Sequence, residues 1–379
     1  MSSVLLLVGV GVAIFVGFNI GGSNTGVAFG PAVGSGAVSK AGAAGLMSVS
    51  FLVGGWTLGR RVVDTLGKDL VAGDPFTMEV SIAVLLFIGL ALFAGNVFGV
   101  PASTSMTAVG AIVGLGLATG RLRVDTVLEI VGWWLLAPVI GFWVSAVVGR
   151  YRYDRLAEAI AIDRTEGPLV TLGGDGAVPR PELGPNTTRR EFIGTILVVV
   201  IGCYMAFSAG TSNVANAVAP LVGNGAVSMT EGVLLASGAT ALGAFTIARR
   251  TLDTVGNDLT ELPLVAAIVV AVVSSSIVTV LSALSVPASF VVIATMSVVG
   301  LGWGRATVAD AVPETPAGPA SGGGPFEDGD RPTAAADGAP PSAAELYQPA
   351  TTARVVLLQN LVPAVATVAA YLVFRYAPL

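Results

Sequence analysis

Long apolar runs, separated by short polar or glycine- and proline-rich stretches, dominate the chain. The main runs cover residues 2–19, 41–58, 80–93 with its flanks, 127–148, 192–206, 231–248, 262–284 and 353–371. Most are unbroken rather than alternating between apolar and polar positions, which favours helices over the strands of an outer-membrane barrel. A helix rises ~1.5 Å per residue, so a run of about 20 residues can cross a bilayer. The pattern therefore predicts a bundle of membrane-spanning helices.

Two polar motifs interrupt this apolar pattern. Residues 18–31 and 207–220 place Gly, Ser, Thr and Asn in the middle of sequence that otherwise reads as membrane helix. Polar and helix-breaking residues are costly inside a bilayer unless they line a site. We therefore predict two unwound membrane helices that face one central site.

The second half of the chain repeats the first. Ser23-Asn24 aligns with Ser212-Asn213, and Pro31 aligns with Pro220 at the same offset. The Arg-Arg-x-x-Asp-Thr-x-Gly-x-Asp-Leu motif of residues 60–70 recurs at residues 249–259, and the Val-Pro-Ala-Ser of residues 100–103 recurs at 286–289. Chance similarity between apolar helices would give scattered Leu and Val, not shared Asn, Pro and Arg-Arg.

The number of crossings in each half predicts how the copies are oriented. We expect five spans and one short piece per half, and an odd number of crossings inserts the second copy upside down. The predicted fold class is an all-α integral membrane protein. It has two inverted-topology repeats of about five to six transmembrane segments, with broken or half helices.

Two non-membrane stretches divide the chain. Residues 150–190 carry Pro and Gly, with arginines at both ends, so the positive-inside rule places this loop in the cytoplasm. Residues 306–350 are acidic and rich in Pro, Ala and Gly, which predicts disorder. The predicted parts are a first transmembrane repeat (1–149), a cytoplasmic linker loop (150–190), a second repeat (191–305), a disordered loop (306–350) and a final transmembrane helix of the second repeat (351–379).

Composition agrees with a membrane protein and narrows the chemistry. The chain is 54% hydrophobic and 11% charged, whereas soluble domains are about 25% charged. It has no histidine, the commonest acid–base group and metal ligand, and its single cysteine, Cys203, excludes an internal disulfide. Nothing matches a P-loop. We expect no enzymatic activity, no cofactor, no resident metal and no nucleic-acid partner.

Hydroxyl and amide side chains supply the candidate chemistry. Pro101 and Pro287 each fit the first position of a helix, which leaves free backbone N–H groups beside nearby hydroxyls. A helix N-terminus carries about half a positive charge and can bind an anion without lysine. A single motif of this kind is more often an ordinary helix cap, but two copies favour a site. The predicted substrate-binding residues are Ser103, Thr104, Ser105, Ser289, Ser23, Asn24, Ser212, Asn213 and Asn216.

The asparagine motifs also suit a cation. Amide oxygens are ligands for hard cations such as sodium, and the predicted cation-binding residues are Asn24, Thr25, Asn213 and Asn216. The alternative is that Gly, Ser and Asn serve close helix packing. Glu231 could be a membrane carboxylate, but Ser228-x-x-Glu231 before an apolar run is better explained as a capping box.

At these motifs the chain resembles the inorganic phosphate transporter family, which also contains sulfate permeases. The family repeats Gly-Ala-Asn-Asp-Val-Ala-Asn-Ala, which is similar to Gly-Thr-Ser-Asn-Val-Ala-Asn-Ala at residues 210–217 and less so to residues 21–28. Its Pro-Val-Ser-Thr-Thr-His motif is similar to Pro-Ala-Ser-Thr-Ser-Met at residues 101–106. Asn24 and Asn213 stand where the family has aspartate, and Met106 stands where it has histidine.

The resemblance implies a secondary active transporter in the plasma membrane that spans the lipid bilayer many times. It would import inorganic phosphate with sodium, or with protons, by alternating access around a midplane oxyanion site. Sodium is the expected coupling ion. Sulfate is the alternative substrate, because a site without carboxylates tolerates an anion that has no proton to donate. A passive anion channel is the alternative from another functional class. A homodimer is a possible assembly.

Overall fold

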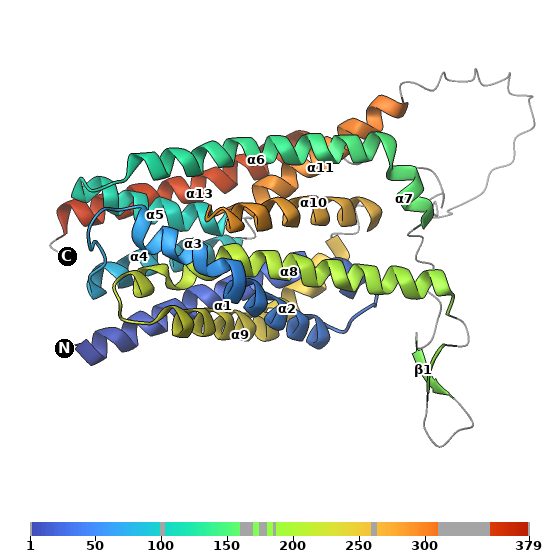
Figure 1. The fold of residues 1–379 in the computed structure, drawn as a ribbon, viewed down its shortest axis with the longest axis horizontal. Helices are drawn as coiled ribbons and strands as arrows, with labels where there is room; N and C mark the ends of the chain where they lie inside the picture. Colours follow the sequence, from blue (N-terminus) through green and yellow to red (C-terminus); the bar gives the residue numbers. More distant parts are fainter. Residues whose placement is uncertain are drawn as a thin grey trace, which may run out of the picture.

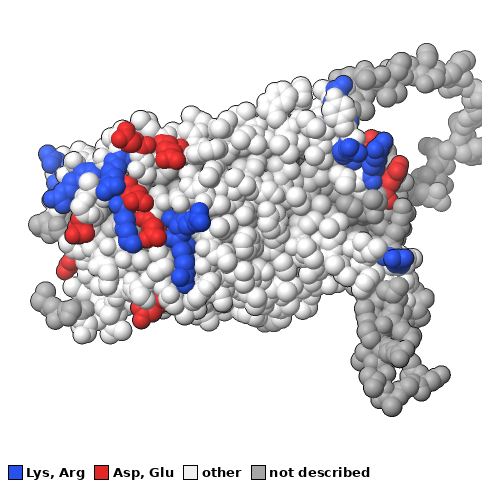
Figure 2. Space-filling view, in the orientation of Figure 1, with Lys and Arg blue, Asp and Glu red and all other residues white. Residues whose placement is uncertain are grey.

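The computed structural model describes residues 2–98, 103–159, 170–173, 180–184, 187–258, 264–309 and 349–377. Its helices lie side by side along the long axis of the molecule (Figure 1). Eight of the described helices are long and apolar enough to cross a membrane. On the face shown in Figure 2, charged side chains gather toward the left and at the right end, and an uncharged belt separates them. The chain is a multi-pass membrane protein.

The described helices and strands follow the two halves of the sequence. The first half contains α1 (Ser2–Gly34), α2 (Lys40–Gly54), the π-helical η1 (Gly55–Gly59), α3 (Arg60–Asp64), the π-helical η2 (Thr65–Asp69), α4 (Met78–Phe98), α5 (Thr104–Thr119) and α6 (Val124–Tyr151). The connection contains α7 (Tyr153–Ala159), β1 (Val170–Gly173) and β2 (Arg180–Leu183). The second half contains α8 (Arg189–Gly223), α9 (Met229–Asp258), α10 (Leu264–Ala283), α11 (Phe290–Ala309) and α13 (Pro349–Tyr376).

Helices of the two halves exchange partners reciprocally. α1 packs on α9 and α8 packs on α2, while α5 packs on α13 and α11 packs on α6. Glycines let the first two pairs approach: a Cβ on Gly21 would lie 2.0 Å from Thr240 O, and a Cβ on Gly210 would lie 2.1 Å from Phe51 O. Gly21 and Gly210 occupy equivalent positions of the sequence repeat. The repeat in sequence is therefore also a repeat in packing.

The corresponding first helices of the two halves enter the bundle from opposite ends. The N terminus, where α1 begins, lies at the left of Figure 1, whereas α8 begins at the right, on the side of β1. Inverted repeats require this arrangement.

Most of the interior of the bundle is apolar, and so is much of its surface. The largest buried side chains include Phe29 of α1, Phe51 of α2 and Leu221 of α8. Large apolar side chains also lie on the outside, for example Leu135 of α6, which is 71% exposed. Exposed apolar surface on this scale suits contact with lipid rather than water.

The predicted unwinding of residues 18–31 and 207–220 is wrong, because α1 and α8 run through both motifs as continuous helices. The polar side chains of the first motif donate hydrogen bonds to carbonyls one turn back in the same helix: Asn19 to Phe15 (2.8 Å), Ser23 to Asn19 (3.1 Å), Asn24 to Ile20 (3.0 Å) and Thr25 to Gly21 (2.7 Å). This back-bonding satisfies polar groups without breaking the helix.

Other boundaries also differ from the prediction. The predicted run of residues 41–58 ends too early, because η1, α3 and η2 continue the helix of α2 to Asp69. The linker at 150–190 contains an antiparallel pair of short strands. α11 extends to Ala309 and α13 starts at Pro349, so most of the predicted disordered loop, residues 310–348, lies outside the described residues.

The capping box at the start of α9 is confirmed. Ser228 N donates to Glu231 Oε2 at 2.9 Å, and Glu231 N donates to Ser228 Oγ at 3.3 Å. Glu231 therefore serves the helix start.

Candidate functional site

Hydroxyl and amide side chains of α5 and α8 meet inside the bundle. Thr104 Oγ1 donates to Asn213 Oδ1, and Asn216 Nδ2 donates to the same oxygen at 3.0 Å. Ser105 Oγ lies 3.1 Å from Ser212 Oγ and 3.4 Å from Asn216 Nδ2. We call these five residues the α8 cluster. It joins the residues that follow the Val-Pro-Ala-Ser of residues 100–103 to the second polar motif, residues 207–220.

The start of α11 reaches the same cluster through its backbone. Ser212 Oγ donates to Ala288 O at 2.9 Å and accepts from Ala288 N at 3.3 Å. Ser289, the next residue, accepts from Val292 N at 3.4 Å through its side chain, as a helix cap does. The N-terminus of α11 therefore lies against α8, beside the residues that also meet α5.

The N-terminus of α5 is capped in the same way. Ser103 Oγ accepts from Met106 N at 3.2 Å, and Ser103 O accepts from Thr107 Oγ1 at 2.8 Å. The remaining backbone N–H groups of the first turn and the positive end of the helix dipole lie at Thr104 and Ser105. Two helix N-termini thus flank the α8 cluster, which favours a negative ligand there.

The cluster is uncharged, and all of it is buried except Thr104, which is half-buried. Ser105 and Asn216 are 0% exposed, Ser212 is 1% exposed and Asn213 is 5% exposed. Among the described residues, Asn216 Oδ1 is a buried oxygen without a hydrogen-bond partner. An unpaired buried amide oxygen costs free energy and calls for a ligand or water. No group of His, Cys, Asp and Glu in the described part of the chain could hold a metal ion, so a cation here would depend on amide and hydroxyl oxygens.

A cavity of about 430 Å³ lies next to the cluster, between α5, α6, α10, α11 and α13. Met106, which follows Ser105, and Ser289, which follows Ala288, both line it. The rest of its lining is mainly apolar, including Trp134 and Ile293. The cavity gives open space beside the cluster but few groups that could bind an ion.

The first asparagine motif is not part of this cluster. Ser23, Asn24 and Thr25 donate to carbonyls of α1 itself, and within the described ranges no hydrogen bond joins them to α5, α8 or α11. The structure thus brings together the predicted residues of the second asparagine motif with Thr104 and Ser105, and it leaves the first motif apart.

Sequence reasoning missed polar partners on α4 and α10. Asn96 Nδ2 donates to Asn19 Oδ1 at 3.1 Å, and Thr211 Oγ1 donates to Ser282 Oγ at 3.0 Å. Ser208 Oγ donates to the backbone oxygen of Ser275 at 3.1 Å. The sequence did carry a signal: amides and hydroxyls within otherwise apolar runs need partners in a membrane.

The helix behind the cluster is irregular. The π-helical η1 lies against α8, where a Cβ on Gly59 would meet the Val214 side chain at 2.6 Å and Gly210 O at 3.0 Å. π-Helical turns are rare and often mark functional sites. This one supports α8 directly beside Ser212 and Asn213.

Comparison with known proteins agrees with these motifs. A model of the phosphate transporter family matches residues 20–318. The sulfate permease CysP of Bacillus subtilis is 29% identical over 295 residues, which cover 77% of this chain and 76% of the permease. A putative phosphate permease of Pyrococcus furiosus is 23% identical over 368 residues, which cover 79% of this chain and 88% of the permease.

A solved structure of a sodium-dependent phosphate transporter shares the fold. It is 18% identical with a TM-score of 0.66, and the match covers 99% of this chain and 100% of that one. The family match at residues 20–318 spans most of the membrane helices. The resemblance first noted at residues 210–217 is confirmed: the chain belongs to the phosphate transporter family, and it is a transporter, not an enzyme.

Proposed function

We propose that the protein is a secondary active transporter of the plasma membrane that imports a small tetrahedral oxyanion together with sodium. The α8 cluster is the proposed binding site, and alternating access around it is the proposed mechanism. The observation that carries the proposal is the meeting of two helix N-termini with buried hydroxyls and amides of α8.

These groups can replace the water around an anion. Thr104, Ser105 and Ser212 carry hydroxyls that can turn their protons toward an oxyanion, and the first turns of α5 and α11 add backbone N–H donors. Because the backbone N–H donors are fixed by the helices, only the hydroxyls need to reorient when the anion enters.

Sodium is the better supported coupling ion. Asn216 Oδ1 is buried and has no hydrogen-bond partner. The nitrogen of the same amide donates to Asn213 Oδ1, so the Asn213 oxygen lies near the Asn216 amide group. Amide oxygens suit a hard cation, whose charge would offset that of the anion in a site without water. Proton coupling would need a titratable group, and the five residues of the α8 cluster include none.

We place sulfate before phosphate as the substrate, because the cluster lacks the carboxylate that would repel sulfate. A carboxylate would accept a hydrogen bond from protonated phosphate and repel sulfate, which has no proton to donate. Asn213 supplies an amide where the family has aspartate, so neither effect operates. The similarity to a sulfate permease over three quarters of both chains points the same way.

Phosphate is the second candidate. The family is named for phosphate, and a relative in Pyrococcus furiosus is called a putative phosphate permease. The hydroxyl and amide groups of the cluster can accept from protonated phosphate as well as donate to it.

Uptake into vesicles containing the purified protein tests the proposal. Labelled sulfate and labelled phosphate would be offered with an inward sodium gradient, with equal sodium on both sides, and with potassium instead. We expect concentrative sulfate uptake only with the sodium gradient, and weaker inhibition by excess phosphate than by excess sulfate. Equal uptake with and without the sodium gradient would refute sodium coupling. Uptake of phosphate but not of sulfate would reverse the substrate assignment.

A further inference from the structure

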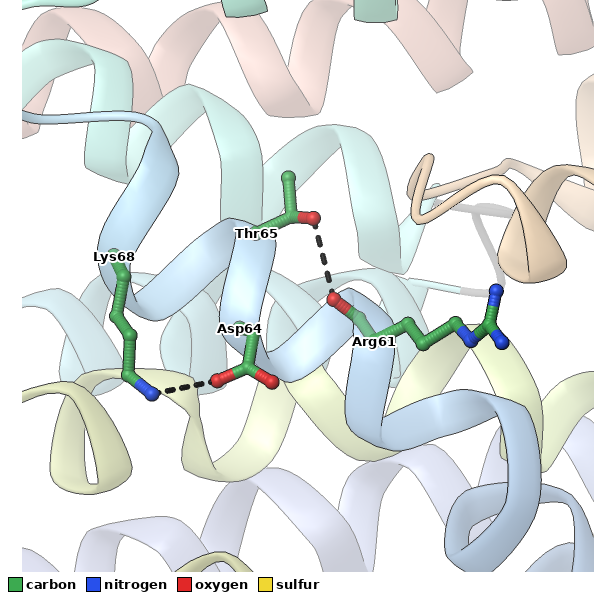
Figure 3. Close-up of polar contacts among 4 residues, drawn as sticks. All are labelled: Arg61, Asp64, Thr65 and Lys68. Atoms are coloured by element: carbon green, nitrogen blue, oxygen red, sulfur yellow. Dashed lines mark hydrogen bonds and ion pairs between the residues drawn. The ribbon is translucent and has the colours of Figure 1, made fainter.

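Two side chains of the α3–η2 segment hold the turn between α10 and α11. Arg61 Nη1 donates to Ala283 O at 2.8 Å, and Thr65 Oγ1 donates to Ser285 O at 2.8 Å. Thr65 Oγ1 also lies 3.2 Å from Arg61 O, the contact drawn in Figure 3. In that view the Arg61 side chain extends toward the tan turn. We call Arg61 and Thr65, with the two carbonyls they bind, the clasp.

The turn needs outside partners because of how α10 ends. Ser285 N donates to Ser282 O at 3.0 Å, and Val286 N donates to Leu281 O at 2.8 Å, the pattern of a Schellman motif. Ser285 has a φ of 66°, a conformation that glycine adopts more easily than serine. The Ala283 and Ser285 carbonyls take no part in these two bonds, and the clasp satisfies both.

The turn leads directly to the proposed site. Pro287 O accepts from Trp134 Nε1 at 2.7 Å, and Ala288 exchanges two hydrogen bonds with Ser212. Only two residues, Val286 and Pro287, therefore separate Ser285 from Ala288, which contacts the α8 cluster. A shift of the turn would move the N-terminus of α11 relative to Ser212.

We propose that Arg61 and Thr65 are positioning residues, which set the affinity for the oxyanion by fixing the N-terminus of α11 against α8. The inference rests on the proposed function of the α8 cluster. The same Arg-x-x-x-Thr spacing recurs in the second copy at Arg250 and Thr254, whose side chains lie outside the described residues.

Transport kinetics test the positioning role. Thr65→Val removes a hydrogen-bond donor without changing charge or size, so it separates positioning from electrostatic attraction. We expect Thr65→Val and Arg61→Gln each to raise the KM for the transported anion by at least about tenfold. Thr65→Ser keeps the hydroxyl and should restore the wild-type KM. An unchanged KM in Thr65→Val, or a Thr65→Ser variant as impaired as Thr65→Val, would overturn the proposal.

Lys68, about one turn after Thr65 in the same helix, offers a matched control. Lys68 pairs with Asp64 at 2.7 Å on the side of the helix away from the turn (Figure 3), and their side chains are 58% and 47% exposed. Lys68→Gln removes one positive charge, as Arg61→Gln does, but leaves the clasp intact. It should keep the wild-type KM, and a KM raised as far as that of Arg61→Gln would assign the effect to charge and overturn the clasp.

Hydrogen exchange tests the clasp without any transport assay. The amides of Ser285 and Val286 should exchange at least about tenfold faster in Arg61→Gln and Thr65→Val than in the wild-type protein or Lys68→Gln. Unchanged exchange in both clasp variants would refute the clasp. If the wild-type protein takes up neither sulfate nor phosphate, the proposed function fails, while faster exchange in the clasp variants would still establish that Arg61 and Thr65 hold the turn.

Discussion

At the scale of single residues, the proposed site offers its ligand neutral hydroxyl and amide groups and no charged side chain. Thr104, Ser105, Ser212, Asn213 and Asn216 are all neutral, and they form one connected hydrogen-bond network. Buried networks of this kind are sensitive to change, because removing one member leaves its partners unsatisfied. The neutral side chains also remove the means by which a carboxylate would distinguish phosphate from sulfate.

Removal of one network member should reduce transport sharply. Asn213→Ala takes away the oxygen that accepts from both Thr104 and Asn216, and Ser103→Ala removes the cap of α5. Each should lower the initial rate of uptake at least about tenfold, while the amount of protein in the membrane stays the same. Immunoblotting beside the uptake assay supplies that control. Normal rates in both variants would show that the site lies elsewhere.

Restoring the family's aspartate should change the choice of substrate. Asn213→Asp places a carboxylate beside Thr104, where it can accept a hydrogen bond from protonated phosphate but repels sulfate. We expect the ratio of sulfate to phosphate uptake to fall at least about tenfold. Competition between the two labelled anions measures this ratio directly. An unchanged ratio would mean that Asn213 does not face the anion.

At the scale of elements, glycines decide how closely the helices cross. Gly210 lies against the backbone of Phe51, and Gly54 lies against the backbone of Phe207, where an added Cβ would meet a carbonyl oxygen at about 2.0 Å. This crossing brings the helix formed by α2 and η1 against α8, directly behind Asn213. The geometry of the cluster therefore depends on a crossing that leaves no room for a side chain between the two helices.

A methyl group at this crossing should destabilise the fold. Gly210→Ala would place a Cβ 2.1 Å from Phe51 O, and overpacking of this kind typically costs ~1–3 kcal/mol or more. Gly238→Ala in α9 is the matched control, because nothing lies within 4 Å of the position that its added Cβ would take. Thermal melting in detergent should show a lowered Tm only for Gly210→Ala. Equal Tm values would contradict the close crossing.

The sequence predicted the membrane helices well but misjudged the polar motifs inside them. Hydrophobic runs mark spans reliably because every backbone polar group in lipid must be paired within a helix. The same rule does not reveal where a polar side chain finds its partner. Asn24 and Thr25 bond back to their own helix, whereas Asn213 bonds across to Thr104. Only the three-dimensional packing separates these two outcomes of one repeated motif.

At the scale of the whole molecule, helices of each half pack extensively on helices of the other half. α1 and α5 pack on helices of the second half, while α8 and α11 pack on helices of the first. The proposed site draws on both halves, since α5 comes from one and α8 and α11 come from the other. In the proposed alternating-access cycle, one pair of packed helices would move against the rest and open the site toward one side of the membrane at a time.

The uncharged site predicts how transport depends on pH. No group in the α8 cluster titrates near neutral pH, and sulfate keeps its charge in this range. Sodium-driven sulfate uptake should therefore change less than about twofold between about pH 6 and about pH 8. Initial rates in buffered vesicles with a constant sodium gradient measure this dependence. A steep rise toward low pH would point to proton coupling through a group outside the cluster.

Counterflow distinguishes a carrier from a pore and so tests whether one site serves both sides of the membrane. Vesicles that hold the protein would be loaded with unlabelled sulfate and then diluted into trace labelled sulfate. An alternating-access transporter should accumulate label transiently above its equilibrium level, and Asn213→Ala should abolish that overshoot. Label that enters equally fast with and without internal sulfate, and never exceeds equilibrium, would show a passive channel instead.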